Sequence, residues 1–110
     1  MSEQYNVIIL PEAQKDIRNI VLYISQELAA PQAALSLQEE FRNSILSLEK
    51  LPKRIKLVNE HPWKNKGIRK LHVKNYYVYF LVDDDEHTVK IIAVIYAGRD
   101  QYKHMTDRSV

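Results

Sequence analysis

The sequence predicts an α+β fold: a helical hairpin packed on a mostly antiparallel four-stranded sheet, in the order β-α-α-β-β-β. Three observations predict it. One short alternating segment opens the chain, two amphipathic helical segments follow, and three β-rich segments come after them. With 110 residues, 45% apolar and 27% charged, the chain is long enough to bury the core of one domain and too short for two. We therefore expect a single domain, residues 1–110.

The first strand is predicted at residues 5–10, because Tyr5, Val7 and Ile9 fall on one side of an extended chain. Pro11 ends this strand. It also suits the first position of a helix, since the N–H that proline lacks would be unpaired there in any case. A strand that leads directly into a helix is therefore the expected start of the fold.

Two amphipathic helices are predicted next, because apolar residues recur at steps of three and four. The first stripe comprises Ala13, Ile17, Ile20, Val21, Ile24 and Leu28, and the second Ala34, Leu37, Phe41, Ile45 and Leu48. Pro31 suits the start of the second helix, and Pro52 ends it by excluding the residue before it from the α region. Because the linker between the helices is short, they should form an antiparallel hairpin.

Residues 53–67 lack a sustained period and are predicted to form an exposed, ordered loop, with a short strand at 55–58 as an option. Three strands are predicted after it, at residues 68–73, 76–82 and 88–96. Lys74 and Asn75 suit a tight hairpin turn, because asparagine tolerates a positive φ. The last strand is apolar on both faces, which is typical of a central strand, and residues 97–110 form a polar tail.

The composition excludes several classes of chemistry. The absence of cysteine excludes disulfides, thiol catalysis and Cys-ligated metal centres. Two glycines are too few for a phosphate-binding loop, and the four histidines fall in no metal-ligand spacing. We therefore expect no cofactor and no metal. No apolar run reaches the roughly 18 residues of a membrane span, and the N-terminus lacks signal-peptide features. These features indicate a cytoplasmic protein with no membrane partner.

The formal net charge of +2 conceals a strong asymmetry along the chain. Between Lys50 and Lys74, nine basic residues stand against a single acid, Glu60, so this segment carries +8 and the remainder −6. Such a basic segment attracts phosphate backbones or an acidic protein partner.

Four segments carry a resemblance to a known family: PEAQKDIRNIVLYISQEL, PQAALSLQEEFRNSILSLEKLP, GIRKLHVKNYYVYFLV and VKIIAVIYAGRDQY. They include a helix start with Ala13, Lys15 and Asp16, and an Arg-x-Leu-x-Val-x-Asn-Tyr hairpin at Arg69, Leu71, Val73, Asn75 and Tyr76. In this order they resemble the RelE/ParE superfamily, toxins of bacterial type II toxin–antitoxin systems. The closing Tyr96-Ala97-Gly98-Arg99-Asp100 has one of the two arginines of that family's Tyr-Gly-Arg-Arg-Asp ending.

The resemblance implies a toxin neutralised by a cognate antitoxin, which covers the helical hairpin or adds a strand to the sheet edge. The start of the second helix, with Pro31, Ala33 and Ala34, is closer to the ParE-like members, which inhibit DNA gyrase. RelE-like members instead cleave mRNA on the ribosome without a metal, and this activity is the alternative. A third reading is an inactive, toxin-like module that only binds its partner.

The basic segment supplies candidate residues for binding a target or nucleic acid: Lys53, Arg54, Lys56, His61, Trp63, Lys64, Lys66 and Lys70. An exposed Trp63 would stack on a base. The same lysines suit an acidic antitoxin segment. They are also compatible with a solvated face that has no partner, in which case Trp63 caps the core.

Arg69 shares strand parity with Leu71 and Val73, so alternation points its guanidinium towards apolar neighbours. An arginine is rarely buried without a partner. A structural ion pair is one reading. The other, for a nuclease, is stabilisation of the charge that develops on a scissile phosphate.

Arg99, Tyr102 and His104 follow the last predicted strand and complete the catalytic set that a nuclease would use. RNA cleavage without a metal needs a base for the 2′-hydroxyl, an acid for the leaving oxygen and a cation for the phosphate. His104 and Arg99 suit two of these roles, and Tyr102 suits stacking or proton donation. A polar tail without catalytic function would have the same composition.

Overall fold

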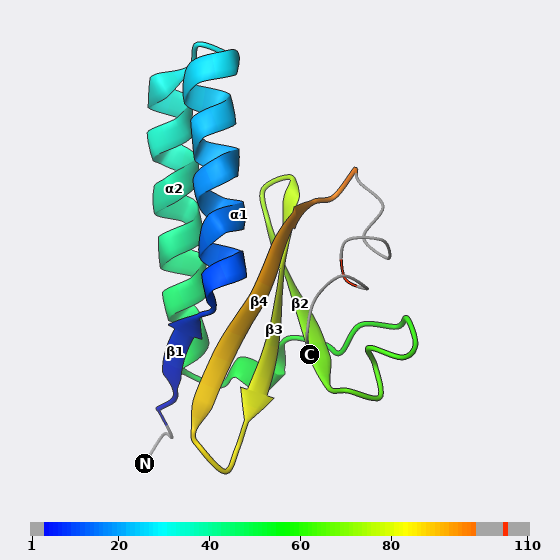
Figure 1. Ribbon diagram of the computed structural model, residues 1–110. Helices are drawn as coiled ribbons and strands as arrows, with labels where there is room; N and C mark the ends of the chain where they lie inside the picture. Colours follow the sequence, from blue (N-terminus) through cyan, green and yellow to red (C-terminus); the bar gives the residue numbers. More distant parts are fainter. Residues whose placement is uncertain (1–3, 99–104, 106–110) are drawn as a thin grey trace.

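The computed structural model describes residues 4–98 and residue 105 (Figure 1). Its main elements are β1 (Asn6–Ile9), α1 (Pro11–Leu22), a π-helical segment (Tyr23–Glu27), α2 (Pro31–Leu46), β2 (Ile68–Val73), β3 (Tyr76–Asp83) and β4 (Thr88–Tyr96). Two 3₁₀ turns, Ser47–Glu49 and Pro52–Arg54, follow α2. The predicted order β-α-α-β-β-β and the α+β class are confirmed, and no helix in the described part of the chain is long and apolar enough to cross a membrane.

The four strands form one sheet in the order β1-β4-β3-β2. β1 runs parallel to β4, and the other two pairings are antiparallel, so the predicted mostly antiparallel sheet is confirmed. β4 lies at the centre, as its apolar composition predicted. Its register to β3 is interrupted, because Phe80 pairs with Ile91 and Tyr79 with Ala93, which leaves Ile92 as an extra residue in β4.

One face of the sheet carries the two helices (Figure 1). The core between the layers consists mainly of the predicted apolar stripes and inward-facing strand residues: Tyr5, Ala13, Leu37, Phe41, Ile45, Leu48, Val73, Val78, Phe80, Val89, Ile91 and Val94. The predicted alternation in β1 is confirmed, since Val7 and Ile9 pack against this core whereas Ile8 is 47% exposed.

The opposite face of the sheet holds a second, smaller core: Val58, Trp63, Ile68, Tyr79, Ile92, Ala93, Ile95 and Met105. The extra residue in β4 helps to build it, because Ile92 and Ala93 both join this core whereas Ile91 and Val94 on either side join the first. Met105 is 1% exposed, so at least one residue of the predicted polar tail contributes to the interior.

The structure differs locally from three expectations. The first helix is regular only to Leu22, beyond which Leu28 N–H bonds to the Tyr23 carbonyl at 3.1 Å, a five-residue step that widens the helix. The optional strand at 55–58 is reduced to an isolated bridge between Leu57 and Arg69. In the β2–β3 turn, the positive φ falls on Lys74, at 54°, and not on Asn75.

Candidate functional site

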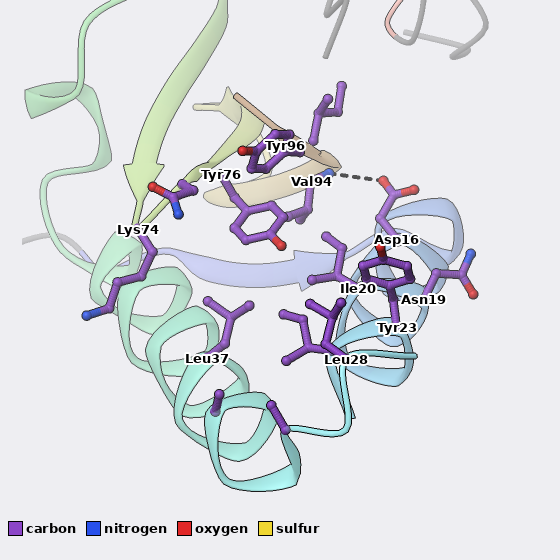
Figure 2. A pocket seen from close by; sticks show the side chains of 15 residues that line it. Asp16, Asn19, Ile20, Tyr23, Leu28, Leu37, Lys74, Tyr76, Val94 and Tyr96 are labelled. Carbon is purple, nitrogen blue, oxygen red and sulfur yellow. Dashed lines mark hydrogen bonds between the residues drawn. The ribbon is translucent and has the colours of Figure 1, made fainter. Parts of the chain in front are cut away.

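A groove of about 980 Å³ lies between the helical hairpin and the β2–β3 turn together with the end of β4 (Figure 2). Its lining is mostly apolar and aromatic, with polar groups near its rim. The helices contribute Asp16, Asn19, Ile20, Tyr23, Ile24, Leu28, Ala30, Ala33 and Leu37, and the sheet contributes Lys74, Asn75, Tyr76, Val94, Ile95 and Tyr96. A concave, largely apolar site with a few polar groups is the usual form of a binding site.

The groove exists because the helical hairpin is longer than the sheet beneath it. Both helices continue past the end of the sheet (Figure 1), so their inward side chains have no strand to cover them there. Tyr23 is 57% exposed and Leu28 56% exposed, although both lie on the groove side of the hairpin. Exposed large apolar side chains gathered in one concavity are typical of an interaction site.

Two tyrosine rings of the sheet, Tyr76 and Tyr96, line the groove. Tyr76 packs edge-to-face against the buried Phe41 of α2, with ring centroids 5.4 Å apart, and against Tyr96 at 5.6 Å. Burial, and after it the neighbouring Tyr96, raises the pKa of Tyr76, so its hydroxyl stays neutral at physiological pH. The two tyrosines therefore give this wall an aromatic, uncharged surface beside Lys74, and through Tyr76 it contacts the core residue Phe41.

Two charged side chains stand on opposite sides of the groove, Asp16 on α1 and Lys74 on the β2–β3 turn (Figure 2). Asp16 Oδ2 accepts a hydrogen bond of 3.0 Å from the Val94 backbone N–H. β1 ends at Ile9, opposite Ile91, so it does not extend far enough to pair with Val94. Asp16 thus completes the hydrogen bonding of β4 where its neighbouring strand has stopped.

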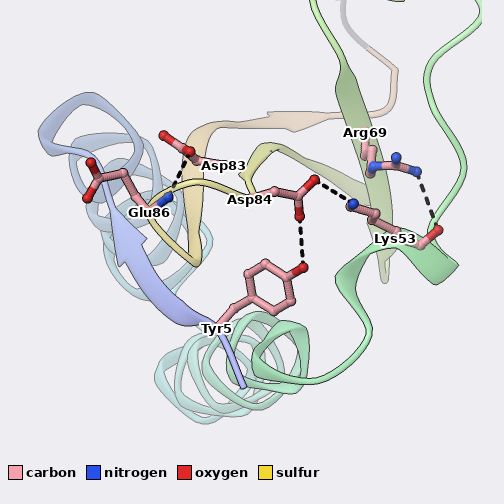
Figure 3. A network of polar contacts seen from close by, with 6 residues as sticks. All are labelled: Tyr5, Lys53, Arg69, Asp83, Asp84 and Glu86. Carbon is pink, nitrogen blue, oxygen red and sulfur yellow. Dashed lines mark hydrogen bonds and ion pairs between the residues drawn. The ribbon is translucent and has the colours of Figure 1, made fainter. Parts of the chain in front are cut away.

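Two predicted binding residues of the basic segment, Arg54 and Lys53, are exposed but engaged in contacts within the chain. The Arg54 guanidinium donates to the carbonyls of Lys50 (2.6 Å) and Leu51 (3.0 Å) and to Ser47 Oγ (3.1 Å). The Lys53 ammonium forms an ion pair with Asp84 on the β3–β4 turn (Figure 3). Arg54 thus closes the turns that follow α2, and Lys53 links them to the β3–β4 turn.

The side chain of Arg69 on β2 anchors the loop by bonding to backbone carbonyls of the loop. Its Nη1 donates to the Ile55 carbonyl at 2.7 Å and, more weakly, to the Lys53 carbonyl at 3.4 Å. Its Nε is buried and has no hydrogen-bond partner among the described residues. Arg69 therefore has a structural role, with backbone carbonyls as partners in place of the expected ion pair, while its role in catalysis stays a prediction.

Trp63 is 4% exposed and belongs to the second core, so it does not offer the ring face that base stacking requires. Of the two roles predicted for Trp63, the structure therefore supports packing in the core and not stacking on a base.

The other predicted basic residues lie at or near the surface. The Lys70 ammonium lies 4.3 Å from the centroid of the Tyr77 ring, a cation–π contact. The remaining predicted residues, Lys56, His61, Lys64 and Lys66, are exposed.

Arg99, Tyr102 and His104 lie outside the described residues. Within residues 4–98 and Met105, no three His, Asp or Glu side chains gather where they would hold a metal ion. The structure therefore brings together a groove that the sequence did not predict, and of the predicted basic set it buries Trp63, engages Lys53, Arg54 and Lys70 in contacts within the chain, and leaves Lys56, His61, Lys64 and Lys66 exposed.

The Asp84 network yields a prediction on pH dependence. The Lys53 ammonium and then the Tyr5 hydroxyl, both hydrogen-bonded to the carboxylate, lower the pKa of Asp84 below its ordinary value. A lowered pKa in the folded state adds stability above the unfolded-state pKa, near 4, and that stability is lost as pH falls through the folded-state pKa. Because both side chains of this ion pair are about half exposed and screened by solvent, we expect Asp84→Asn to have only a slightly lower urea midpoint than the wild type at pH 7, with the difference vanishing in acid. A difference that persisted unchanged at low pH would contradict this.

Comparison with known proteins places this fold in a class. A family model described as the ParE toxin of the type II toxin–antitoxin system parDE matches residues 7–101. The chain is thus a toxin of the RelE/ParE superfamily. It belongs to the ParE toxin family and is the toxin component of a type II toxin–antitoxin system. A comparison with curated proteins found no match.

Solved structures share the fold at low sequence identity. The chromosomal ParDE system from P. aeruginosa aligns with a TM-score of 0.71 and 17% identity, covering 86% of this chain and 98% of that one. A mutant E. coli RelE toxin in the free state aligns at 0.63 and 16%, covering 94% and 96%. The RelBE2 toxin–antitoxin complex from Mycobacterium tuberculosis aligns at 0.58 and 20%, covering 84% and 98%. At these identities the likeness establishes the fold.

Proposed function

We propose that this toxin blocks DNA gyrase by binding it, without a catalytic step of its own. The observation that carries the proposal is that Arg69, the described residue predicted to act on a scissile phosphate, donates to the backbone carbonyls of Ile55 and Lys53. A metal-independent nuclease needs cations available to the scissile phosphate. Arg69 instead connects β2 to the loop, and the exposed Lys53 and Arg54, predicted to bind a target or nucleic acid, are engaged by Asp84 and by backbone carbonyls, which favours binding over cleavage. Membership of the ParE toxin family supports the same choice.

A second candidate is ribosome-dependent cleavage of mRNA. It is favoured by the exposed part of the loop, where Lys56, Lys64 and Lys66 lie with His61. Exposed lysines contribute salt-dependent affinity for phosphates, and a histidine supplies a base or an acid near neutral pH. In this case the catalytic partners would be Arg69, Arg99, Tyr102 and His104.

Two assays on the purified chain separate these functions. One measures inhibition of gyrase supercoiling, and the other maps mRNA 5′ ends on translating ribosomes. We expect inhibited supercoiling with intact mRNA. Cuts in register with codons that Arg99→Ala abolishes would overturn the gyrase proposal in favour of the nuclease. If neither assay responds and the antitoxin still binds, the chain is an inactive binding module.

We further propose that the groove is the seat of the cognate antitoxin, which enters with an apolar segment carrying a carboxylate opposite Lys74. Two features support this occupant. The walls are apolar and aromatic over most of their surface, and Lys74 supplies an exposed positive charge at the rim. Solved structures of similar fold include toxin–antitoxin complexes.

Reversing the charge of Lys74 at the rim tests whether the antitoxin binds in the groove. Lys74→Glu should weaken antitoxin binding about tenfold at low salt, because it places like charges opposite one another. Glutamate at this position meets the same φ of 54° as lysine, so the backbone cost is similar. Lys56→Glu makes the same charge change outside the groove and is the matched control. Equal losses from both variants, measured by isothermal titration calorimetry, would mean that net charge and not the groove determines binding.

A further inference from the structure

We propose that Tyr96 determines which partner segment the groove accepts, and that Gly98 is the positioning residue that sets the place of the Tyr96 ring. The inference rests on the proposed function, in that the groove is taken as the seat of the antitoxin. It assigns a specific role to two residues at the end of β4, neither of which belongs to the basic segment.

Tyr96 is the most exposed ring in the aromatic series Phe41–Tyr76–Tyr96, which begins in the core on α2 and ends on the sheet wall of the groove. Phe41 is 1% exposed, Tyr76 is half-buried, and Tyr96 is 47% exposed. The Tyr96 ring meets Tyr76 at an interplanar angle of 66° and lines the mouth of the groove. Exposed aromatic side chains beside an apolar pocket are often the residues on which binding energy concentrates. A partner that enters the groove therefore has to fit against this ring.

A glycine is needed at position 98 because of the Tyr96 ring and not because of the backbone conformation. A Cβ atom at this position would lie 2.5 Å from Cε2 of Tyr96 and 3.1 Å from its Cδ2, well inside van der Waals contact. The φ of Gly98 is outside the left-handed region, in contrast to Gly67 at 82°, so an alanine is compatible with the local backbone. The glycine leaves the space in which the Tyr96 ring lies.

The segment between the two residues is fixed, so a clash must displace the ring. The Ala97 N–H donates a 2.8 Å hydrogen bond to the Asn75 carbonyl, which ties the end of β4 to the β2–β3 turn. The Tyr96 side chain is 47% exposed and is not part of either core, so moving its ring leaves both cores packed. We therefore expect Gly98→Ala to reshape the mouth of the groove while leaving the fold intact.

A double-mutant cycle tests the inference. The probe is the full-length cognate antitoxin, which we expect to be encoded by the reading frame next to this one, and it is titrated against wild type, Gly98→Ala, Tyr96→Ala and the double variant. Gly98→Ala should weaken binding about tenfold, with the thermal midpoint unchanged. In the Tyr96→Ala background, Gly98→Ala should have no further effect, because the atoms that clash are absent.

Other results would overturn the inference. These are wild-type affinity in Gly98→Ala, additive losses in the double variant, or a fall in the thermal midpoint that accounts for the weaker binding. A wild-type chain that does not bind the neighbouring protein at all would instead overturn the antitoxin assignment on which the inference rests. The two failures are therefore distinguishable by the wild-type titration alone.

Discussion

Replacing Trp63 by alanine is expected to lower the free energy of unfolding by about 3–5 kcal/mol, the usual cost of truncating a large buried aromatic side chain. Trp63 is 4% exposed in the second core and is followed by a compact turn, in which the Lys66 and Ile68 N–H groups both donate to its carbonyl at 3.1 Å. Removing the indole would leave a cavity between the loop and the sheet and loosen residues 53–67.

Urea unfolding followed by circular dichroism measures the effect, since the chain has a single tryptophan and the variant loses its fluorescence. Lys64→Ala, at the exposed neighbouring position, is the control and should change stability by about 0.5 kcal/mol or less. A Trp63→Ala variant with wild-type stability and weakened nucleic-acid binding would contradict the structural role and restore the stacking role.

Replacing Asp16 by alanine should cost about 1.5–3 kcal/mol, the usual contribution of a hydrogen bond to a charged group. The Val94 N–H would lose its acceptor at a part-buried position on β4 where β1 no longer runs alongside. Asp16→Asn keeps an oxygen acceptor on a side chain of the same shape and should recover much of the loss.

Hydrogen exchange of the Val94 amide gives a residue-specific measurement of this bond. We expect faster exchange in Asp16→Ala than in Asp16→Asn, with a parallel shift of the urea midpoint. Asn19→Ala, one turn further along the same helix and also on the groove, is the control. Unchanged protection of Val94 in Asp16→Ala would mean that the carboxylate does not hold the strand edge.

The three C-terminal strands show how far the sequence predicts local structure. The strands at Ile68–Val73 and Thr88–Tyr96 have the predicted bounds, because alternation and turn residues act over a few neighbours. The first helix was predicted to Leu28 but is regular only to Leu22, since its apolar stripe continues through the π-helical segment. Hydrophobic periodicity indicates which face of a helix is buried. It does not show where an α-helix gives way to a π-helix.

The candidate site was less predictable, because its parts come from distant segments. Asp16 was noted only as part of a helix-start motif, and Tyr76 only as part of a hairpin motif, yet both line the groove with Tyr96. A sequence signal was present in two tyrosines: Tyr76, which follows the hairpin turn, and Tyr96, which ends the last strand. The sequence did not show that the helices extend beyond the sheet in space, and this difference in length creates the groove.

The sequence by itself determined the class of fold, the order of its elements and the family, because these follow from short-range periodicity, prolines and ordered motifs. Only the tertiary structure decided which residues of the basic segment are buried and which contacts they make. Loop residues 53–67 fold back onto the second face of the sheet, so Trp63 enters a core and Arg69 is held by backbone carbonyls of the loop. Burial and hydrogen bonding depend on contacts between segments far apart in the chain, and local composition does not specify them.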